Sequence, residues 1–151
     1  MIAWLLTAGL RRWRQGTLRQ LPRAQALGPL GEDLAADYLE RAGFRIHERN
    51  WRPKTGRGEL DIIASEGGVL VFVEVKTRSS EEWARPAAAV DAAKRRRLSL
   101  TAEDYLRQLE DRRVASRFDV VEVLLAGGEV RDVRHVINAF PYDPRPVRRF
   151  R

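Results

Sequence analysis

Apolar residues recur along the chain with two different periods, and these periods predict its helices and strands. From Gly31 to Ala42 the spacing is that of a helix with one buried face, and Gly43 follows where a helix C-cap would lie. A second helix is predicted over Pro86–Leu109. The residues available for its buried side are Val90, Ala93, Leu98, Ala102, Tyr105 and Leu106.

Five further segments have the composition of strands: Arg45–Trp51, Glu59–Ala64, Val69–Lys76, Phe118–Leu125 and Val130–Ile137. Two glycines between the second and third strands suit a tight turn and predict an antiparallel hairpin. Phe118–Leu125 is almost continuously apolar, as expected of a strand buried on both faces. The order α-β-β-β-α-β-β therefore predicts an α/β domain with a mixed central β-sheet flanked by helices.

The two ends of the chain differ from this domain. Residues 1–29 are rich in arginine and have no sustained apolar face, which predicts a flexible basic arm. The Gly28-Pro29 pair is a break signal, so the folded domain is expected over residues 30–140. Residues 141–151 are rich in proline and arginine and predict an unstructured tail.

The first ten residues are apolar, but arginines follow this run, whereas a secretory signal places its positive charge first. The run is also shorter than the about 20 residues that a membrane-spanning helix needs. We therefore expect a cytoplasmic protein with no integral membrane association. A helix lying on a membrane surface through Trp4, Leu5 and Trp13 is an alternative use of the arm.

Lysine and arginine outnumber aspartate and glutamate by 28 to 21, which gives a net charge of +7. Such a surface attracts polyanions, of which nucleic acid is the commonest, although a solvated arginine-rich surface explains the charge equally well. The chain has no cysteine, which excludes thiol chemistry and thiolate metal sites, and two histidines are too few for a histidine-built site. A metal would therefore bind carboxylates, whose oxygen atoms suit Mg²⁺ or Mn²⁺.

Acidic residues interrupt the strand Glu59–Ala64. Because side chains alternate across a strand, Glu59 and Asp61 are predicted on one face, with Leu60 and Ile62 on the other. An unpaired buried charge is very costly, so these acids belong either to a paired ionic cluster or to an active site. The alternative is that they mark the exposed side of an edge hairpin.

On the partner strand, Glu74 and Lys76 share a face with Leu70 and Phe72. That face begins apolar and becomes charged at the end of the strand, where sites in such sheets tend to open. This pattern weighs against a simple exposed face.

Phosphodiester hydrolysis needs a divalent ion to neutralise the phosphate and activate a water molecule, and a cation to stabilise the developing charge or orient that water. Two carboxylates on adjacent strands, followed by a lysine, supply these groups. The pKa of a lysine can also be lowered to assist proton transfer, whereas that of arginine cannot. Only three of the 28 basic residues are lysines, so a lysine at position 76 is consistent with a chemical demand, although chance also explains a single case.

The two segments Gly58-Glu59-Leu60-Asp61-Ile62-Ile63 and Phe72-Val73-Glu74-Val75-Lys76-Thr77-Arg78 together resemble the YraN-like family of small bacterial proteins. These proteins are predicted nucleases of the PD-(D/E)xK superfamily. Gly31-Glu32, the helical segment Lys94–Leu98 and the strand segment Arg117–Val121 add to the resemblance. The similarity covers roughly residues 30–140 and implies a restriction-endonuclease-like core.

Within that superfamily the pattern is most similar to the archaeal Holliday junction resolvases. Carried over by position, the resemblance implies four catalytic residues: Glu32, Asp61, Glu74 and Lys76. Asp61 and Glu74 would ligate Mg²⁺ or Mn²⁺ together with the Val75 carbonyl, and Lys76 would orient water or steady charge. Glu59 is an additional candidate ligand.

At three positions the resemblance has an exception or another explanation. Leu60 stands where the superfamily's name has proline, a departure common in the resolvase-like branch. Glu32 lies at a helix N-terminus, where an acid is favoured by the macrodipole in any protein. Asp119 is expected to pair with a neighbouring arginine rather than to bind metal.

Basic residues near the motif are candidates for nucleic-acid binding: Arg78, Lys94, Arg95, Arg96 and Arg97. An exposed, solvated helix face explains the last three equally well.

The sequence therefore favours a metal-dependent endonuclease that acts on DNA, with branched or structured DNA in recombination or repair as the expected substrate. The alternatives are a non-catalytic nucleic-acid-binding protein on a nuclease fold and a membrane-surface scaffold that uses the N-terminal arm. Resolvases usually work as two-fold dimers, so the analogy points to a homodimer, although the sequence itself carries no interface signal.

Overall fold

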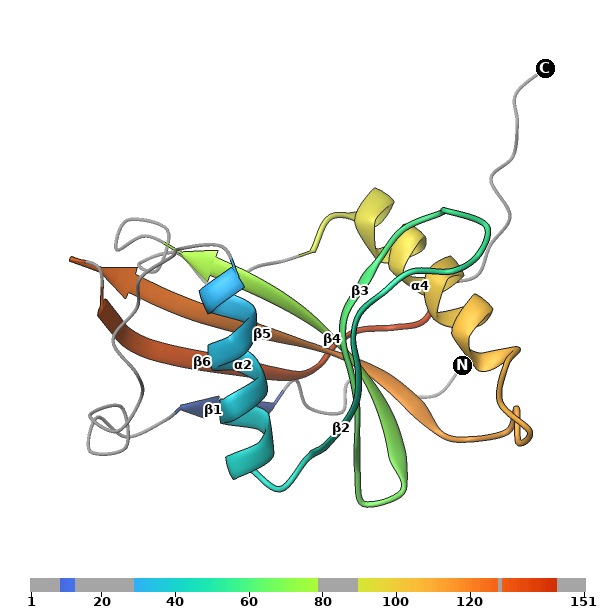
Figure 1. The fold of residues 1–151 in the computed structure, drawn as a ribbon, viewed down its shortest axis with the longest axis horizontal. Helices are drawn as coiled ribbons and strands as arrows, with labels where there is room; N and C mark the ends of the chain where they lie inside the picture. The colour runs from blue at the N-terminus through green and yellow to red at the C-terminus, as the bar shows by residue number, and fades with distance from the viewer. Residues whose placement is uncertain (1–8, 13–28, 79–89, 128, 144–151) are drawn as a thin grey trace.

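The computed structural model describes residues 9–12, 29–78, 90–127 and 129–143. Its elements are β1 (Gly9–Arg12), α2 (Pro29–Arg41), β2 (Arg45–Trp51), β3 (Leu60–Glu66), β4 (Val69–Arg78), α4 (Ala92–Leu106), β5 (Ser116–Ala126) and β6 (Glu129–Phe140). The strands form one mixed sheet in the order β1-β6-β5-β4-β3-β2, in which β4 and β5 are parallel and the other neighbours are antiparallel. The two helices lie against this twisted sheet (Figure 1).

The predicted α/β class and the order α-β-β-β-α-β-β are confirmed for five strands and two helices. The sheet also contains β1, which was not expected, because it comes from the segment interpreted as a flexible arm. It pairs antiparallel with β6 at the edge of the sheet. Pro29, the last residue assigned to that arm, begins α2. Residues 1–8 and 13–28 lie outside the described residues, as does the tail after residue 143.

Helix α2 buries one face against the sheet, as its spacing predicts. Leu34, Ala35 and Leu39 are at most 1% exposed and pack with residues of β3, β4 and β5. The helix ends at Arg41, and Gly43 follows two residues later with a φ of 94°, in the left-handed region. The backbone N–H groups of Gly43 and Phe44 donate to the carbonyls of Glu40 and Leu39, which closes the last turn.

The hairpin of β3 and β4 is confirmed. Gly67 and Gly68 have φ values of 56° and 79°, the two positive values that a type I′ turn requires, and Glu66 pairs with Val69 across it. Side chains of β4 alternate between the helices: Val71 and Val73 pack on the α2 side, and Leu70 and Phe72 on the α4 side. The hairpin therefore presents one face to each helix.

Helix α4 begins at Ala92, later than the predicted Pro86, and residues 86–89 lie outside the described part. Asp91 caps the helix in an extended conformation, and its carboxylate accepts a 2.8 Å hydrogen bond from the backbone N–H of Lys94. Val90 is buried but precedes this cap, and Ala93, expected on the buried side, is exposed. The remaining predicted core positions of the helix pack on the second face of the sheet: Leu98, Ala102, Tyr105 and Leu106.

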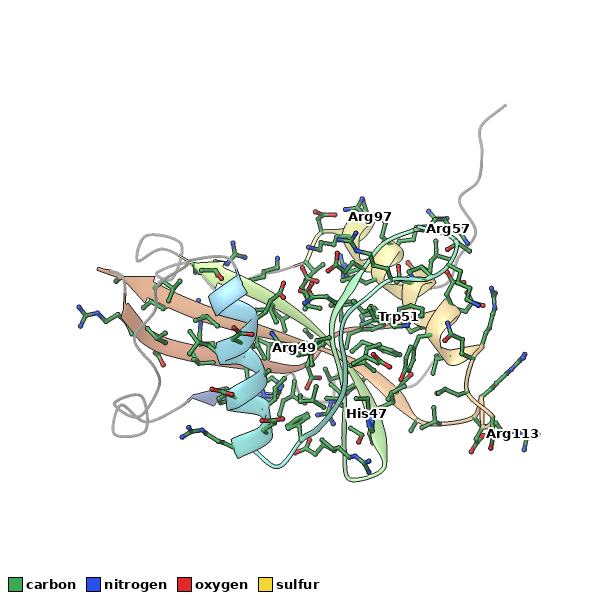
Figure 2. All side chains as sticks on the ribbon, in the orientation of Figure 1. His47, Arg49, Trp51, Arg57, Arg97 and Arg113 are labelled. Carbon is green, nitrogen blue, oxygen red and sulfur yellow. The ribbon has the colours of Figure 1, made fainter. Side chains whose placement is uncertain are left out.

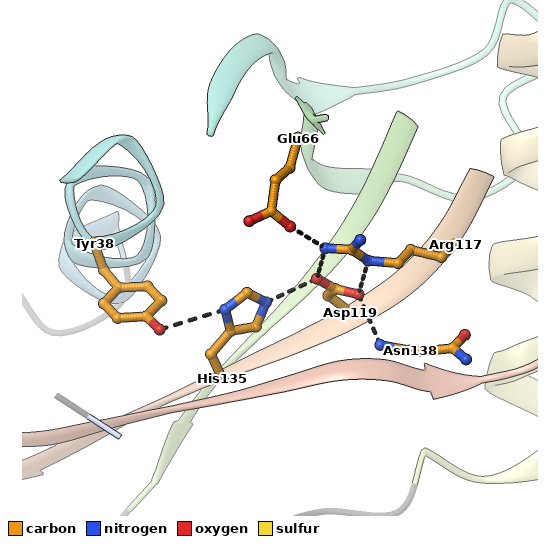
Figure 3. Close-up of polar contacts among 6 residues, drawn as sticks. All are labelled: Tyr38, Glu66, Arg117, Asp119, His135 and Asn138. Carbon is orange, nitrogen blue, oxygen red and sulfur yellow. Dashed lines mark hydrogen bonds and ion pairs between the residues drawn. The ribbon is translucent and has the colours of Figure 1, made fainter. Parts of the chain in front are cut away.

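Strand β5 is buried on both faces, as its apolar run predicts, although it carries two buried acids. Asp119 is fully buried and accepts hydrogen bonds from Arg117, from Nε2 of His135 at 2.8 Å and from the backbone N–H of Asn138 at 2.9 Å (Figure 3). The pairing of Asp119 with an arginine is thereby confirmed. Burial alone would raise the pKa of Asp119, but the hydrogen bonds from His135 and Arg117 outweigh it and hold that pKa below 3.8.

Because an ionised carboxylate only accepts hydrogen bonds, Nε2 of His135 must carry the proton. Its Nδ1 lies 3.4 Å from the hydroxyl of Tyr38 in α2. Arg117 extends the network to Glu66 at 2.9 Å. These contacts connect α2, β3, β5 and β6 on one side of the sheet, and they lie outside the candidate site.

Among the described residues, no helix is long and apolar enough to cross a membrane.

Candidate active site

Asp61 lies where β3 separates from β4. The antiparallel pairing of these strands extends as far as Ile62 and Val73, while Leu60 pairs with Trp51 of β2. Oδ2 of Asp61 accepts a 2.8 Å hydrogen bond from the backbone N–H of Val75, so the carboxylate takes the place of a strand partner. The end of the β3–β4 ladder thus fixes Asp61 beside the Glu-x-Lys segment. The Val75 carbonyl as a metal ligand remains a prediction.

Leu60 does not lie where the simple alternation of β3 places it. It is 2% exposed and packs in the cluster of Ile63 and Phe72 on the α4 side, whereas Ile62 packs on the α2 side. The irregular register between β2 and β3 and the end of the ladder with β4 break the period of two at this point.

Glu74 is 7% exposed and forms an ion pair with the ammonium group of Lys94 in the first turn of α4. It therefore faces α4, on the side of Leu70 and Phe72, as predicted. Lys76 follows two residues later and is partly exposed. Burial and the positive charges of Arg78 and Lys94 lower the pKa of Lys76 below its ordinary value.

The candidate acids line an open pocket of about 360 Å³. Its lining residues come from α2, from the loop before β3, from β3 and β4, and from α4: Glu32, Gly58, Glu59, Asp61, Glu74, Lys94, Arg97, Leu98 and Thr101. This one pocket therefore contains six of the predicted site residues, from four elements and a loop. They are the acids Glu32, Glu59, Asp61 and Glu74, with Lys94 and Arg97.

Glu32 is brought to the pocket by a close approach of α2 to β4. A Cβ atom on Gly31 would lie 2.3 Å from Oγ1 of Thr77, far inside van der Waals contact, so a glycine at this position lets the first helical turn lie against the end of β4. The next residue, Glu32, then reaches the pocket lining. Glu32 thus lies in the first turn of α2, where the helix dipole favours an acid, and it also lines the candidate pocket.

Glu59 also lines the pocket, but its carboxylate has another partner. Arg52 donates to Oε2 of Glu59 from Nε at 3.0 Å and from a terminal nitrogen at 2.7 Å. The loop before Glu59 rests on α4, where the hydroxyl of Thr101 lies 3.3 Å from the Arg57 carbonyl oxygen. In Figure 2, Arg57, on the loop before β3, and Arg97, on α4, both lie in the upper part of the view.

Asp61 carries the clearest electrostatic signature of the site. Burial, followed by the negative charge of Glu74, raises the pKa of Asp61 from 3.8 to about 7, and Glu32 adds to the shift. The hydrogen bond from the Val75 N–H acts in the opposite direction but does not cancel it. Acids that repel one another in a partly buried pocket are typical of sites that bind a cation or transfer a proton.

The carboxylates of Asp61 and Glu74 are hard oxygen ligands, which fit Mg²⁺ or Mn²⁺, and the ammonium of Lys94 already occupies one of them as a cation. Within the described ranges, however, no group of three acidic, histidine or cysteine side chains is close enough together to hold an ion unaided. A bound ion would therefore need further oxygen ligands, from backbone, water or a substrate phosphate.

The predicted nucleic-acid-binding residues divide into two groups. Lys94 and Arg97 line the pocket. Arg78 instead lies 3.4 Å from the buried carboxylate of Glu122, and Arg95 lies on α4 without lining the pocket. Sequence reasoning did not identify the ionic cluster of Glu122 with Arg78 and Arg134, although a glutamate inside an apolar strand signals one.

Sequence reasoning also missed Thr101 and the role of Gly58. A Cβ on Gly58 would lie 2.2 Å from Oγ1 of Thr101, and the φ of Gly58 is 74°. Gly58 was noted only as part of the motif, and nothing in the sequence marks Thr101 as its contact.

A family model described as uncharacterised protein family UPF0102 matches residues 31–123, which include every candidate acid. The chain belongs to the UPF0102 family. The resemblance to the YraN-like family is thereby confirmed. A UPF0102 protein of Rhodococcus opacus is 48% identical over 115 residues, which cover 76% of this chain and 96% of the relative. One of Dictyoglomus thermophilum is 42% identical over the same shares, and one of Solibacter usitatus is 49% identical over 65% and 74% of the two chains.

Proposed function

We propose that this UPF0102 protein is a metal-dependent endonuclease that hydrolyses phosphodiester bonds of DNA. The observation that carries the proposal is the meeting of Asp61 and Glu74 in one pocket, with Lys76 two residues beyond Glu74. A bound Mg²⁺ or Mn²⁺ would neutralise the phosphate and activate a water molecule. Asp61 and Glu74 would hold this ion together with the Val75 carbonyl. Glu59 is a further candidate ligand, but it would first have to leave Arg52 and move closer to the two other acids.

Lys76 would supply the cation that the reaction needs in addition to the metal ion. Its pKa is already lowered by burial and by neighbouring positive charges, so its amine can exchange a proton at a less alkaline pH than an ordinary lysine. It would orient the attacking water or stabilise the charge that develops on the phosphate. Glu32, which lines the pocket, would contact that water or complete the ligand set.

The basic residues at the pocket would bind the nucleic acid. Lys94 and Arg97 lie in the pocket lining, where they can contact the phosphate to be cut and its neighbour. Arg78 and Arg95 would contact phosphates of the DNA that lie farther from the bond to be cut. A branched or otherwise structured DNA substrate, a homodimeric enzyme and a cytoplasmic location follow from the resemblance and the sequence pattern, and are part of the proposal.

The proposal is tested by incubating the purified full chain with linear duplex, single-stranded, flap and four-way-junction DNA, with Mg²⁺, with Mn²⁺ or with a chelator. Asp61→Asn keeps the size of the side chain and removes its charge. Glu40→Gln, at an exposed site on α2, is the matched control. Metal-dependent products from wild type and Glu40→Gln, but not from Asp61→Asn, are expected. No cleavage of any substrate by the wild type contradicts the enzyme.

One observation favours a second function, that of a nucleic-acid-binding protein without catalysis. The ammonium of Lys94 neutralises the carboxylate of Glu74 without any metal, so the negative charge of Glu74 does not require a bound cation. Such a protein would bind DNA with an affinity that falls with salt and is unchanged in Asp61→Asn, because the phosphate contacts come from basic residues. Binding without cleavage in all metals would support it.

A further inference from the structure

The ion pair of Glu74 and Lys94 joins the proposed metal ligand to α4. Glu74 is 7% exposed, whereas the side chain of Lys94 is 38% exposed and lines the pocket. A buried carboxylate is thus held by a cation that can be reached from the solvent. This cation contacts Oε1 of Glu74, an oxygen atom that a bound metal ion would use.

The backbone of Lys94 is fixed while its ammonium group is not. The N-cap Asp91 accepts a 2.8 Å hydrogen bond from the Lys94 N–H, which anchors the residue in the first turn of α4. Four methylene groups then connect this anchor to the ammonium. The charged end can therefore change partners without any change in the helix.

We propose that Lys94 exchanges partners: it holds Glu74 while the site contains no metal, and it contacts a substrate phosphate once a metal ion takes Glu74. The inference rests on the proposed function and goes beyond it, because it makes metal binding and nucleic-acid binding dependent on each other.

The exchange follows from the charges in the pocket. A divalent ion and an ammonium group repel each other, so a metal ion bound to Glu74 weakens the ion pair of that carboxylate with Lys94. Arg97 lines the same pocket as Lys94, so release from Glu74 leaves the ammonium near another positive charge. Arg52 already holds the carboxylate of Glu59. A phosphate group at the pocket mouth would then be the strongest available partner.

Removal of the charge on Lys94 should therefore have two effects of opposite sign. The metal would bind more tightly, because it no longer competes with the ammonium for Glu74. Nucleic acid would bind more weakly to the metal-loaded protein, because a phosphate contact is lost. A residue with a purely structural role would not strengthen metal binding, so the pair of effects is diagnostic.

The first experiment measures Mn²⁺ binding to the metal-free full chain by calorimetry. Lys94→Gln is expected to bind Mn²⁺ about two to five times more tightly than wild type, the range of a partly exposed ion pair. Lys94→Arg keeps the charge and Lys54→Gln removes a lysine at an exposed position outside the pocket lining, so both should match wild type. Equal or weaker Mn²⁺ binding by a folded Lys94→Gln would overturn the exchange.

Mn²⁺ binding by Asp61→Asn distinguishes a failure of the Lys94 exchange from a failure of the proposed metal site. If wild type binds Mn²⁺ and Asp61→Asn does not, the metal site stands even where Lys94→Gln shows no gain. If wild type and Asp61→Asn bind Mn²⁺ equally, the proposed metal site is wrong and the exchange is overturned with it.

A second measurement needs no variant. The chain has three lysines, Lys54, Lys76 and Lys94, so selective labelling of lysine side chains yields three resolvable NMR signals. The Lys94 signal should move on saturation with Mg²⁺ and move again on addition of a short duplex DNA, while the Lys54 signal stays in place. A Lys94 signal that Mg²⁺ leaves unchanged would contradict the exchange.

Discussion

The backbone N–H of Val75 donates a 2.8 Å hydrogen bond to Oδ2 of Asp61. This contact joins β3 to β4 where their ladder has ended, and it places a carboxylate beside Glu74. The same placement makes Asp61 costly to ionise, because burial and Glu74 raise its pKa to about 7. A residue that is unfavourable for the metal-free fold and sits in an open pocket is typical of a functional site.

Asp61→Asn is expected to stabilise the metal-free protein at pH 8. An acid whose pKa is higher in the folded state than in the unfolded state destabilises the fold as pH rises, here between about pH 4 and pH 7. The gain should be about 1–2 kcal/mol at pH 8 and vanish near pH 4. Urea unfolding at both pH values in a chelating buffer measures it, and a variant less stable than wild type at pH 8 would contradict the assignment.

Asp119→Asn is expected to have the opposite effect. Its hydrogen bonds from His135 and Arg117 hold the pKa of Asp119 below 3.8, so the carboxylate stabilises the fold above that pH and this stability is lost as pH falls through the folded-state pKa. Loss of one partner from a buried ionic network costs about 3–5 kcal/mol. Urea unfolding at pH 7 checks the loss, and a change below about 1 kcal/mol would show that the network contributes little.

Gly31→Ala is expected to disturb the site through Thr77. The added Cβ would lie 2.3 Å from Oγ1 of Thr77 but 3.7 Å from its Cβ, so removal of the hydroxyl relieves the clash. The single variant should lose about 1–3 kcal/mol of unfolding free energy, as in other overpacked contacts. The double variant Gly31→Ala/Thr77→Ala should recover most of this loss. Equal stability of the two variants would locate the damage elsewhere.

Gly58 and Gly56 provide a matched comparison in the loop before β3. Both have a positive φ, 74° and 72°, but only at Gly58 would a Cβ meet the Thr101 hydroxyl, at 2.2 Å. Gly56→Ala should therefore show only the backbone cost of about 1 kcal/mol, and Gly58→Ala should cost at least about 1 kcal/mol more. Thermal unfolding of both variants gives the difference. An equal cost would mean that the loop moves away from α4 freely.

Much of the fold could be predicted from the sequence because its signals are local. The helix before Gly43 and the hairpin around Gly67 each follow from a period of apolar residues and a turn residue with the required conformation. The face shared by Glu74 and Phe72 follows from strand alternation alone.

What could not be predicted depends on contacts between distant segments. Leu60 changes sides because the β3–β4 ladder ends and the β2–β3 register is irregular, which no period within one strand reveals. Strand β1 lacks an apolar period and forms by pairing with β6. The ion pair of Lys94 with Glu74 depends on how α4 crosses the sheet, so the sequence identified both residues but not their contact.

The proposed nuclease depends on Glu74, which lines the pocket, and on Lys76, which follows two residues later in β4 outside the pocket lining. Single-turnover cleavage of a labelled four-way junction with Mg²⁺ decides it, with wild type, Glu74→Gln, Lys76→Gln and the exposed control Glu40→Gln. We expect cleavage by wild type and Glu40→Gln, and a loss of roughly 100-fold or more in each of the other two, the scale of one lost transition-state contact. Cleavage that persists at the wild-type rate in Glu74→Gln and Lys76→Gln would show that the pocket is not the active site.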